Sequence, residues 1–137
     1  MDTYYIDSNV VISIVETSQP LSEEQSRFLR LLDEGKVKAL TSELTLAECL
    51  VKPFADRNAV AVSAYLEFLD GRQNFPVIPV SREILLAAAR LRGKKNVKLP
   101  DAIHLATAGA FGCTVFLSND RRLRSVDDLR ILAWSQS

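Results

Sequence analysis

Four acidic residues, well separated in the sequence, fall where an apolar strand is expected to end or a helix to begin. They are Asp7, Glu48, Asp101 and Asp120. Several carboxylates gathered in a partly desolvated crevice repel one another, so unless they are protonated they need a cation. Oxygen ligands without a His or Cys cluster favour Mg²⁺ or Mn²⁺ over zinc. These residue types therefore indicate metal-assisted phosphodiester hydrolysis, in which the ion activates a water and offsets charge on the phosphate oxygens.

Short apolar runs alternate with helical patterns along the chain, and this alternation sets where the acids would lie. The predicted strands span residues 3–6, 37–40, 75–80, 114–117 and 129–133. The predicted helices span residues 9–15, 22–35, 45–51, 57–69, 81–91 and 100–111. Such alternation predicts an α/β fold in which helices cover a parallel sheet, with ligands bound at the carboxyl ends of the strands. We expect the run at 75–80 to form a short or edge strand, because prolines bracket it.

Residues typical of helix starts predict where two of the acids lie within their helices. The Ser22 side chain and Gln25 have capping-box spacing, and Thr45 repeats that spacing with Glu48, which predicts Glu48 in the first turn of a helix. Pro100 suits the first turn of another helix and carries Asp101 beside it. We expect Pro53 to interrupt the third helix and Gly93 to close the fifth.

Helix capping is the alternative explanation for each acid, because carboxylates are favoured at helix N-termini. Taken singly, capping is the better interpretation of any one of them. It does not explain why all four positions carry Asp or Glu, since Ser, Thr or Asn would cap as well. Asp7 is the hardest to explain as a cap, because Ser8 and Asn9 follow it and offer uncharged caps.

Charge is unevenly distributed although the net charge is zero. Residues 1–68 contain 6 Lys and Arg against 11 Asp and Glu, and residues 69–137 contain 11 against 6. The basic residues that we expect to bind a phosphate backbone flank the later acids and are Lys94, Lys95, Lys98, Arg121 and Arg122. A solvated helix face and loop is the alternative interpretation of each basic run.

Length and composition restrict the class of protein. A chain of 137 residues with 47% hydrophobic and 25% charged residues is typical of one globular domain, here expected over 1–137. Neither a basic leader nor a run of about 20 apolar residues is present, so we expect a cytoplasmic protein without a membrane partner. Cys49 and Cys113 lie in apolar surroundings and are expected to be buried, reduced thiols.

Four segments around the acids resemble the acidic motifs of PIN-domain nucleases, and they occur in the same order. These segments are YIDSNVVI at 5–12, LTLAE at 44–48, LPDAIHLATA at 99–108 and LSND at 117–120. The resemblance covers nearly the whole chain. Because the chain is small, it is most similar to the VapC-type toxins of toxin-antitoxin pairs.

The resemblance implies a three-layer α/β/α sandwich around a parallel sheet and an Mg²⁺- or Mn²⁺-dependent endoribonuclease that acts on RNA. It also implies a homodimer and a cognate antitoxin protein. Position by position, the acidic quartet corresponds to Asp7, Glu48, Asp101 and Asp120, as both catalytic and metal-binding residues. The supporting polar residues are Ser8, which stands where many members have threonine, Asn9, Ser118 and Asn119.

Two alternatives remain beside this interpretation, and one residue is left out of it. His104, the only histidine, lies one helical turn after Asp101 among apolar neighbours, so we expect a packed or supporting role and not a catalytic one. An aspartyl-phosphate enzyme is disfavoured because Asn9 stands where a second acid would assist a nucleophilic Asp7. A catalytically silent PIN-like module that binds RNA or a partner protein is the second alternative.

Overall fold

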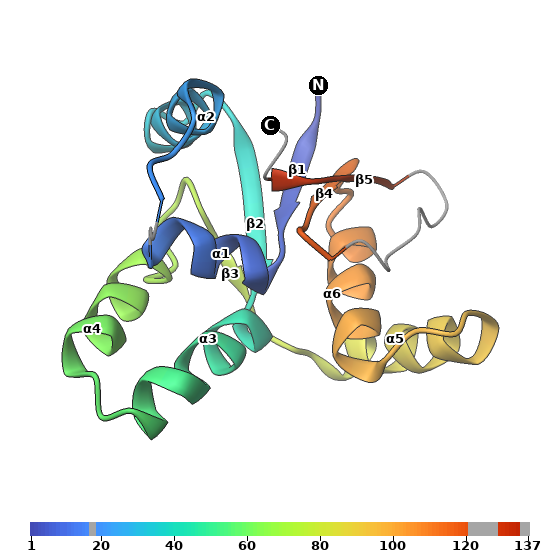
Figure 1. Cartoon of the computed structure of the whole chain (residues 1–137). Coiled ribbons are helices and arrows are strands. Elements are labelled where there is room, and N and C mark those ends of the chain that lie inside the picture. The colour runs from blue at the N-terminus through green and yellow to red at the C-terminus, as the bar shows by residue number, and fades with distance from the viewer. Residues whose placement is uncertain (17–18, 121–128, 135–137) are drawn as a thin grey trace.

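Strands and helices alternate in the computed structural model, which describes residues 1–16, 19–120 and 129–134 (Figure 1). The strands are β1 (Thr3–Ile6), β2 (Lys38–Ser42), β3 (Val77–Ile78), β4 (Val115–Leu117) and β5 (Arg130–Leu132). The α-helices are α1 (Ser8–Val15), α2 (Glu23–Asp33), α3 (Glu43–Ala55), α4 (Ala59–Phe68), α5 (Arg82–Lys94) and α6 (Leu99–Ala110). Each predicted element is found, with boundaries shifted by a few residues.

The strands form one parallel sheet in the order β3-β2-β1-β4-β5. β1 is central, and its Tyr5 pairs with Leu40 of β2 on one side and Phe116 of β4 on the other. The carboxyl ends of β1, β2 and β4 therefore lie at the same edge of the sheet. β3 has two residues and lies at the margin, as the flanking prolines predicted.

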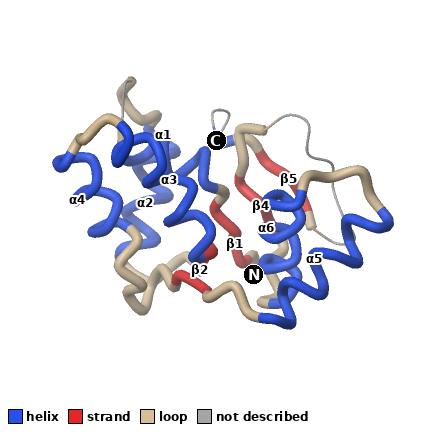
Figure 2. The backbone as a smooth tube through the Cα atoms, turned by 90° about the horizontal axis from the view of Figure 1, so that it is seen from below, coloured by secondary structure: helices blue, strands red, loops and turns tan. Residues whose placement is uncertain are grey.

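Helices cover both faces of the sheet, because alternate strand residues point to opposite sides. Ile6, Ala39 and Val115 pack in one core cluster with residues of α1 to α4. Tyr5 and Phe116 pack in a second cluster with residues of α6. Figure 2 shows α1 to α4 on one side of the strands and α5 and α6 on the other. The predicted three-layer α/β/α sandwich is thus confirmed.

The start of α3 differs from its prediction. Ser42 is the N-cap and its side chain accepts a hydrogen bond from the Leu44 N–H, so the helix begins at Glu43. Glu48 consequently lies in the second turn, not the first. Thr45 does not cap the helix because its hydroxyl is fully buried, 2.7 Å from that of Thr41. The Ser22–Gln25 capping box of α2, in contrast, is confirmed.

Two expected helix ends are also wrong. α3 runs through Pro53 to Ala55, although proline lacks the N–H that would bond to the carbonyl one turn earlier. α5 passes Gly93 and ends at Lys94, since glycine is tolerated inside a helix at a cost of about 1 kcal/mol relative to alanine. Within the described ranges, no helix has the length and apolar character to cross a membrane.

Candidate active site

Asp7 lies at the junction of β1 and α1 and is 4% exposed. Its backbone N–H donates to the Leu117 carbonyl of β4 at 3.0 Å, which fixes the residue at the edge of the sheet. Asp7 is the N-cap of α1, and its Oδ1 accepts from the Ser8 N–H at 2.8 Å. The expectation that Asp7 is the acid least explained by capping is therefore wrong. A carboxylate has two oxygens, however, and capping occupies one of them.

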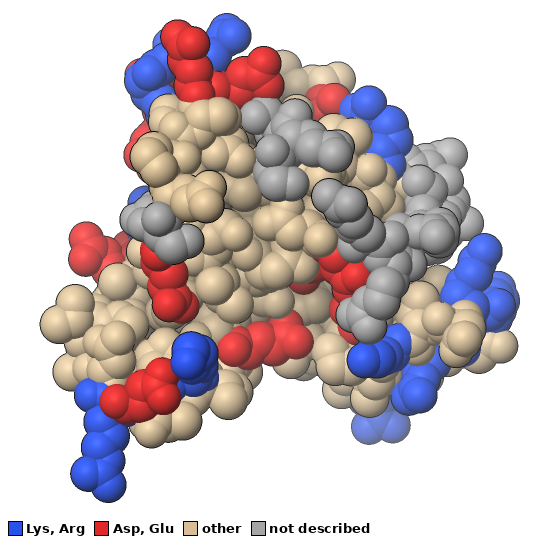
Figure 3. All heavy atoms as spheres, viewed as in Figure 1, with Lys and Arg blue, Asp and Glu red and all other residues tan. Residues whose placement is uncertain are grey.

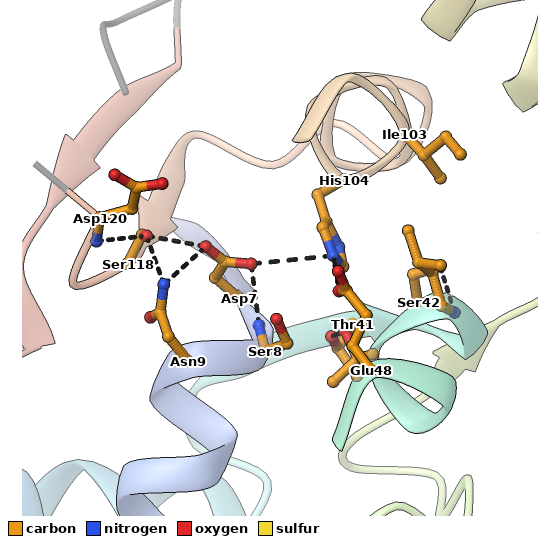
Figure 4. A network of polar contacts seen from close by, with 12 residues as sticks. Asp7, Ser8, Asn9, Thr41, Ser42, Glu48, Ile103, His104, Ser118 and Asp120 are labelled. Atoms are coloured by element: carbon orange, nitrogen blue, oxygen red, sulfur yellow. Dashed lines mark hydrogen bonds and ion pairs between the residues drawn. The ribbon is translucent and has the colours of Figure 1, made fainter. Parts of the chain in front are cut away.

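The second oxygen of Asp7 is held by side chains from two elements (Figure 4). Oδ2 accepts from Ser118 Oγ at 2.7 Å and from Asn9 Nδ2 at 3.1 Å. Ser118 Oγ in turn accepts from the Asp120 N–H at 3.0 Å, and Asn9 Oδ1 accepts from the Asn119 N–H at 2.9 Å. The structure thus brings together all four predicted supporting residues around Asp7.

Glu48 reaches this edge from α3 and meets His104 from α6. Glu48 Oε1 lies 2.6 Å from His104 Nε2, and Asp7 Oδ1 lies 3.8 Å from the same nitrogen. The Glu48 side chain is 34% exposed, whereas the His104 side chain is 2% exposed. One buried imidazole nitrogen therefore lies between two of the predicted acids, and both carboxylates face it in Figure 4.

The electrostatics of the two carboxylates differ. Burial acts to raise the pKa of Glu48, but its interactions with His104 and with the Ser8 hydroxyl outweigh burial, and the pKa falls below its ordinary value. The groups that donate hydrogen bonds to the Asp7 carboxylate, from Ser8, Asn9 and Ser118, are uncharged. In the described part of the chain, no Lys or Arg forms an ion pair with Asp7. A buried carboxylate without a fixed counter-ion is costly unless a cation joins it.

The remaining two predicted acids lie in the first turn of α6 and shortly after β4. Asp101 is half-buried in the first turn of α6, as Pro100 predicted, one turn before His104. Asp120 is also half-buried and follows β4 by three residues. Among residues 1–16, 19–120 and 129–134, no three Asp, Glu, His or Cys side chains are arranged to hold a metal ion. Asp7 is linked to Glu48 through His104 and to the Asp120 backbone through Ser118. The oxygen donors of the acids fit Mg²⁺ or Mn²⁺ by chemical type.

The predicted basic residues flank the acids on one side. Lys94 ends α5, Lys98 is the N-cap of α6, and both are exposed, as is Lys95 between them. Figure 3 shows Lys and Arg atoms gathered over α5, beside acidic atoms that face outward between the helical layers. The other two predicted basic residues, Arg121 and Arg122, lie outside the described residues.

Sequence reasoning gave His104 a packed or supporting role, but it did not identify Tyr5 or the contact between the two residues. The Tyr5 hydroxyl lies 2.5 Å from His104 Nδ1, and both residues are at most 1% exposed. Two signals were present. Tyr5 precedes Asp7 by two residues across the end of β1, and His104 follows Asp101 by three residues, one turn later on the same face of α6.

Comparison with known proteins agrees with this architecture. The PIN domain family matches residues 4–129. The structure of VapBC2 from Rickettsia felis, bound to a DNA fragment from their promoter, is similar with a TM-score of 0.76 and 16% identity, over 96% of this chain and 98% of that one. The DNA-bound VapBC from Salmonella typhimurium gives a TM-score of 0.69 and 18% identity, over 98% and 99%.

A third solved structure is that of VapC20 from Mycobacterium tuberculosis, described as a Sarcin-Ricin loop cleaving toxin. It matches with a TM-score of 0.60 and 15% identity, over 83% of this chain and 87% of that one. No curated protein matches the chain. The sandwich with acids at its carboxyl edge defines the class of protein, and the family match identifies it: the chain belongs to the PIN domain family.

Proposed function

We propose that this protein is a divalent-metal-dependent endoribonuclease that hydrolyses RNA phosphodiester bonds as the toxin of a type II toxin-antitoxin pair. The observation that carries the proposal is the environment of Asp7. The residue is 4% exposed, its carboxylate accepts hydrogen bonds from uncharged donors, and it faces the same imidazole nitrogen as Glu48. Such a site favours a bound cation, because two nearby carboxylates in a desolvated crevice repel each other.

Each acidic and polar side chain has a role in this proposal. Mg²⁺ or Mn²⁺ would be held by Asp7, Glu48, Asp101 and Asp120, and when bound it supplies a Lewis acid and an activated water. Ser118 and Asn9 orient the Asp7 carboxylate through the bonds to Oδ2. Ser8 and Asn119 complete this hydrogen-bonded frame. The frame fixes the position of Asp7 before substrate arrives, which reduces the cost of reorganisation.

RNA is the proposed substrate because the surroundings suit a polyanion. Exposed Lys94, Lys95 and Lys98 lie next to the start of α6, which carries Asp101, and would bind backbone phosphates together with Arg121 and Arg122. A surface hollow of about 380 Å³ also borders Asn119, and polar groups and Trp134 line it. The resemblance in fold to a toxin described as cleaving the Sarcin-Ricin loop supports the same substrate class.

A protein partner follows from the same comparisons and from the surface. Similar structures were solved as VapBC complexes, which supports a cognate antitoxin for this chain. The packed pair α3 and α4 also exposes large apolar side chains. These are Val51, Phe54, Val60 and Leu66, between 49% and 81% exposed. Such a surface favours association, with an antitoxin or with a second copy in a homodimer.

The test is a cleavage assay on structured RNA with purified protein. We expect cleavage in Mn²⁺ or Mg²⁺, loss of cleavage in EDTA, and recovery when Mn²⁺ is added back. Asp101→Asn should remain inactive after Mn²⁺ is restored, while circular dichroism shows an unchanged fold. Cleavage that persists in EDTA and in the variant would contradict the metal-dependent mechanism.

One observation favours the second candidate, a silent PIN-like module that binds RNA or a protein. The described acids do not form a ready metal-binding group. Calorimetry separates the two functions: a nuclease binds Mn²⁺ at or below millimolar concentration. A protein that binds RNA but shows no heat of Mn²⁺ binding is the silent module.

A further inference from the structure

The imidazole of His104 joins parts of the molecule that lie on opposite faces of the sheet. His104 belongs to α6, and Glu48 belongs to α3 on the other face. The two helices meet beyond the carboxyl ends of the strands, where Nε2 lies 2.6 Å from Glu48 Oε1. The same nitrogen lies 3.8 Å from Asp7 Oδ1. A single ring nitrogen thus faces both carboxylates across the edge of the sheet.

The other end of the ring is fixed from the core. Nδ1 lies 2.5 Å from the Tyr5 hydroxyl, and the Tyr5 ring stacks on Phe116 at 4.9 Å between centroids. The Tyr5 side chain is a phenol, whose hydroxyl can donate a hydrogen bond to a ring nitrogen. A phenol that donates to Nδ1 leaves the ring proton on Nε2. That proton faces Glu48.

The direction of the Glu48 bond follows from its carboxylate. An ionised carboxylate only accepts hydrogen bonds, so at 2.6 Å the proton must be carried by His104 Nε2. The Glu48 side chain has three rotatable bonds and is one-third exposed. Without His104 as a partner, it would therefore sample other rotamers.

A packed core histidine is the simpler interpretation, and it explains only part of the geometry. Burial requires partners for both ring nitrogens, which any carbonyl or hydroxyl of the core would provide. Here the partner of Nε2 is a partly exposed acid of the candidate site, with a second acid in reach. The contact extends from the core to the site, as supporting hydrogen bonds to ligands commonly do.

We propose that His104, oriented by Tyr5, is a positioning residue that holds the Glu48 carboxylate beside Asp7 in readiness for a divalent cation. The proposal rests on the proposed function, since the acids are there the metal ligands. It assigns no proton transfer to His104. The hydrogen-bonded chain from Tyr5 through His104 to Glu48 sets the position of the Glu48 carboxylate.

The first experiment measures Mn²⁺ affinity by isothermal titration calorimetry, without RNA. His104→Leu should weaken affinity about 10- to 100-fold, the usual loss when a partner of a metal ligand is removed. His104→Gln should recover most of it, because its amide nitrogen is as many bonds from Cα as Nε2 and still donates. Tyr5→Phe should give a smaller loss, since the ring remains and only the orienting hydroxyl is gone.

Thr107→Val is the matched control. Thr107 is fully buried on the same helix, and its hydroxyl donates to the Ile103 carbonyl, so the change removes a buried polar group whose hydrogen bond involves none of the acids. It should change stability without changing Mn²⁺ affinity. Equal or tighter Mn²⁺ binding by folded His104→Leu would overturn the proposal, as would a His104→Gln variant that binds as weakly as His104→Leu.

The second experiment needs no metal. It therefore tests the contact between His104 and Glu48 even if the wild-type chain binds no metal and the proposed function is wrong. His104 is the only histidine, and ¹⁵N spectra of the ring therefore contain one set of signals. We expect a proton on Nε2 that exchanges slowly with water, and an Nε2 signal that moves in Glu48→Gln and less in Thr107→Val. A ring protonated only on Nδ1, or one insensitive to Glu48→Gln, would overturn the inference.

Discussion

β1 has an aspartate at each end. Each aspartate accepts a hydrogen bond from a hydroxyl group next to β4, but the two differ in their charged partners. Asp2 precedes the strand and accepts from the hydroxyl of Thr114, which precedes β4, at 2.8 Å. Asp7 follows the strand and accepts from the hydroxyl of Ser118, which follows β4, at 2.7 Å. The difference lies in the counter-ion. Asp2 pairs with Arg130 at 2.9 Å, whereas in the described residues Asp7 has no Lys or Arg partner.

Exposure makes the difference in counter-ion consequential. The side chain of Asp2 is 41% exposed, so water and Arg130 both stabilise its charge. The side chain of Asp7 is 6% exposed, and its hydrogen bonds come from neutral groups. An exposed, paired carboxylate contributes little beyond local structure. A buried carboxylate without a fixed cation is costly to keep for structure alone. The comparison is consistent with a structural role for Asp2 at one end of β1 and with the metal site proposed above at the other end.

The largest expected difference between the two ends is in RNA cleavage. Asp7→Asn keeps an oxygen for the Ser8 N–H and so preserves the cap, but it removes a charge from the site. We expect kcat/KM to fall on the order of 1,000-fold, since the metal contributes several kcal/mol and each 1.4 kcal/mol is tenfold. Asp2→Asn should stay within about twofold. Comparable losses in both variants would break the comparison.

Metal-dependent stabilisation should show the same asymmetry without substrate. A ligand that binds only the folded state at 100 times its Kd adds about 2.7 kcal/mol to the free energy of unfolding. We expect thermal denaturation of wild type and of Asp2→Asn to shift upward in saturating Mn²⁺. Asp7→Asn should show little or no shift. A shift of equal size in Asp7→Asn would place the ion elsewhere.

The two hydroxyls that hold the aspartates give a smaller effect. Ser118→Ala removes a donor to Asp7 Oδ2 and the acceptor for the Asp120 N–H, and we expect cleavage to fall about 10- to 100-fold. Thr114→Val leaves the Thr3 N–H without its hydroxyl acceptor, which should cost about 1 to 3 kcal/mol of stability. It should leave cleavage unchanged. Paired urea-unfolding and cleavage measurements would show a crossed pattern, and parallel changes would contradict it.

The sequence predicted which residues lie at the acidic end of β1, but it did not predict the N-cap of α3. Apolar runs and turn residues locate the strand ends, and parallel pairing then brings Asp7 and Ser118 to one edge. The N-cap predicted for α3 was wrong because two neighbouring residues offered equal alternatives. Ser42 and Thr45 both suit an N-cap, and burial of the Thr45 hydroxyl against Thr41 decided between them. That contact depends on how α3 packs on the sheet, which no local pattern contains.

Long-range pairs set the rest of the site. His104 meets Tyr5 and Glu48, which are 99 and 56 residues away, and Asp2 meets Arg130 at a separation of 128. From sequence, His104 is a histidine among apolar neighbours, and this context correctly indicated a packed residue. It did not reveal that the buried ring faces two acids, because that depends on where α3 and α6 meet.

The smallest expected effect concerns pH at the structural end. The hydrogen bond from Thr114 and, with less weight, the charge of Arg130 hold the pKa of Asp2 below its ordinary value of 3.8. A pKa lowered by folding contributes stability that is present above the unfolded-state pKa and is lost as pH falls below 3.8.

We therefore expect wild type to be slightly more stable than Asp2→Asn from pH 7 down to about pH 5, with the difference closing below pH 3.8. Urea midpoints at matched pH measure it, and 1 M salt should reduce the difference at pH 7 because an exposed pair is screened. A difference that grows on acidification would mean that Asp2 is not stabilised as a carboxylate. The two ends of β1 would then need another explanation than the presence or absence of a fixed cation.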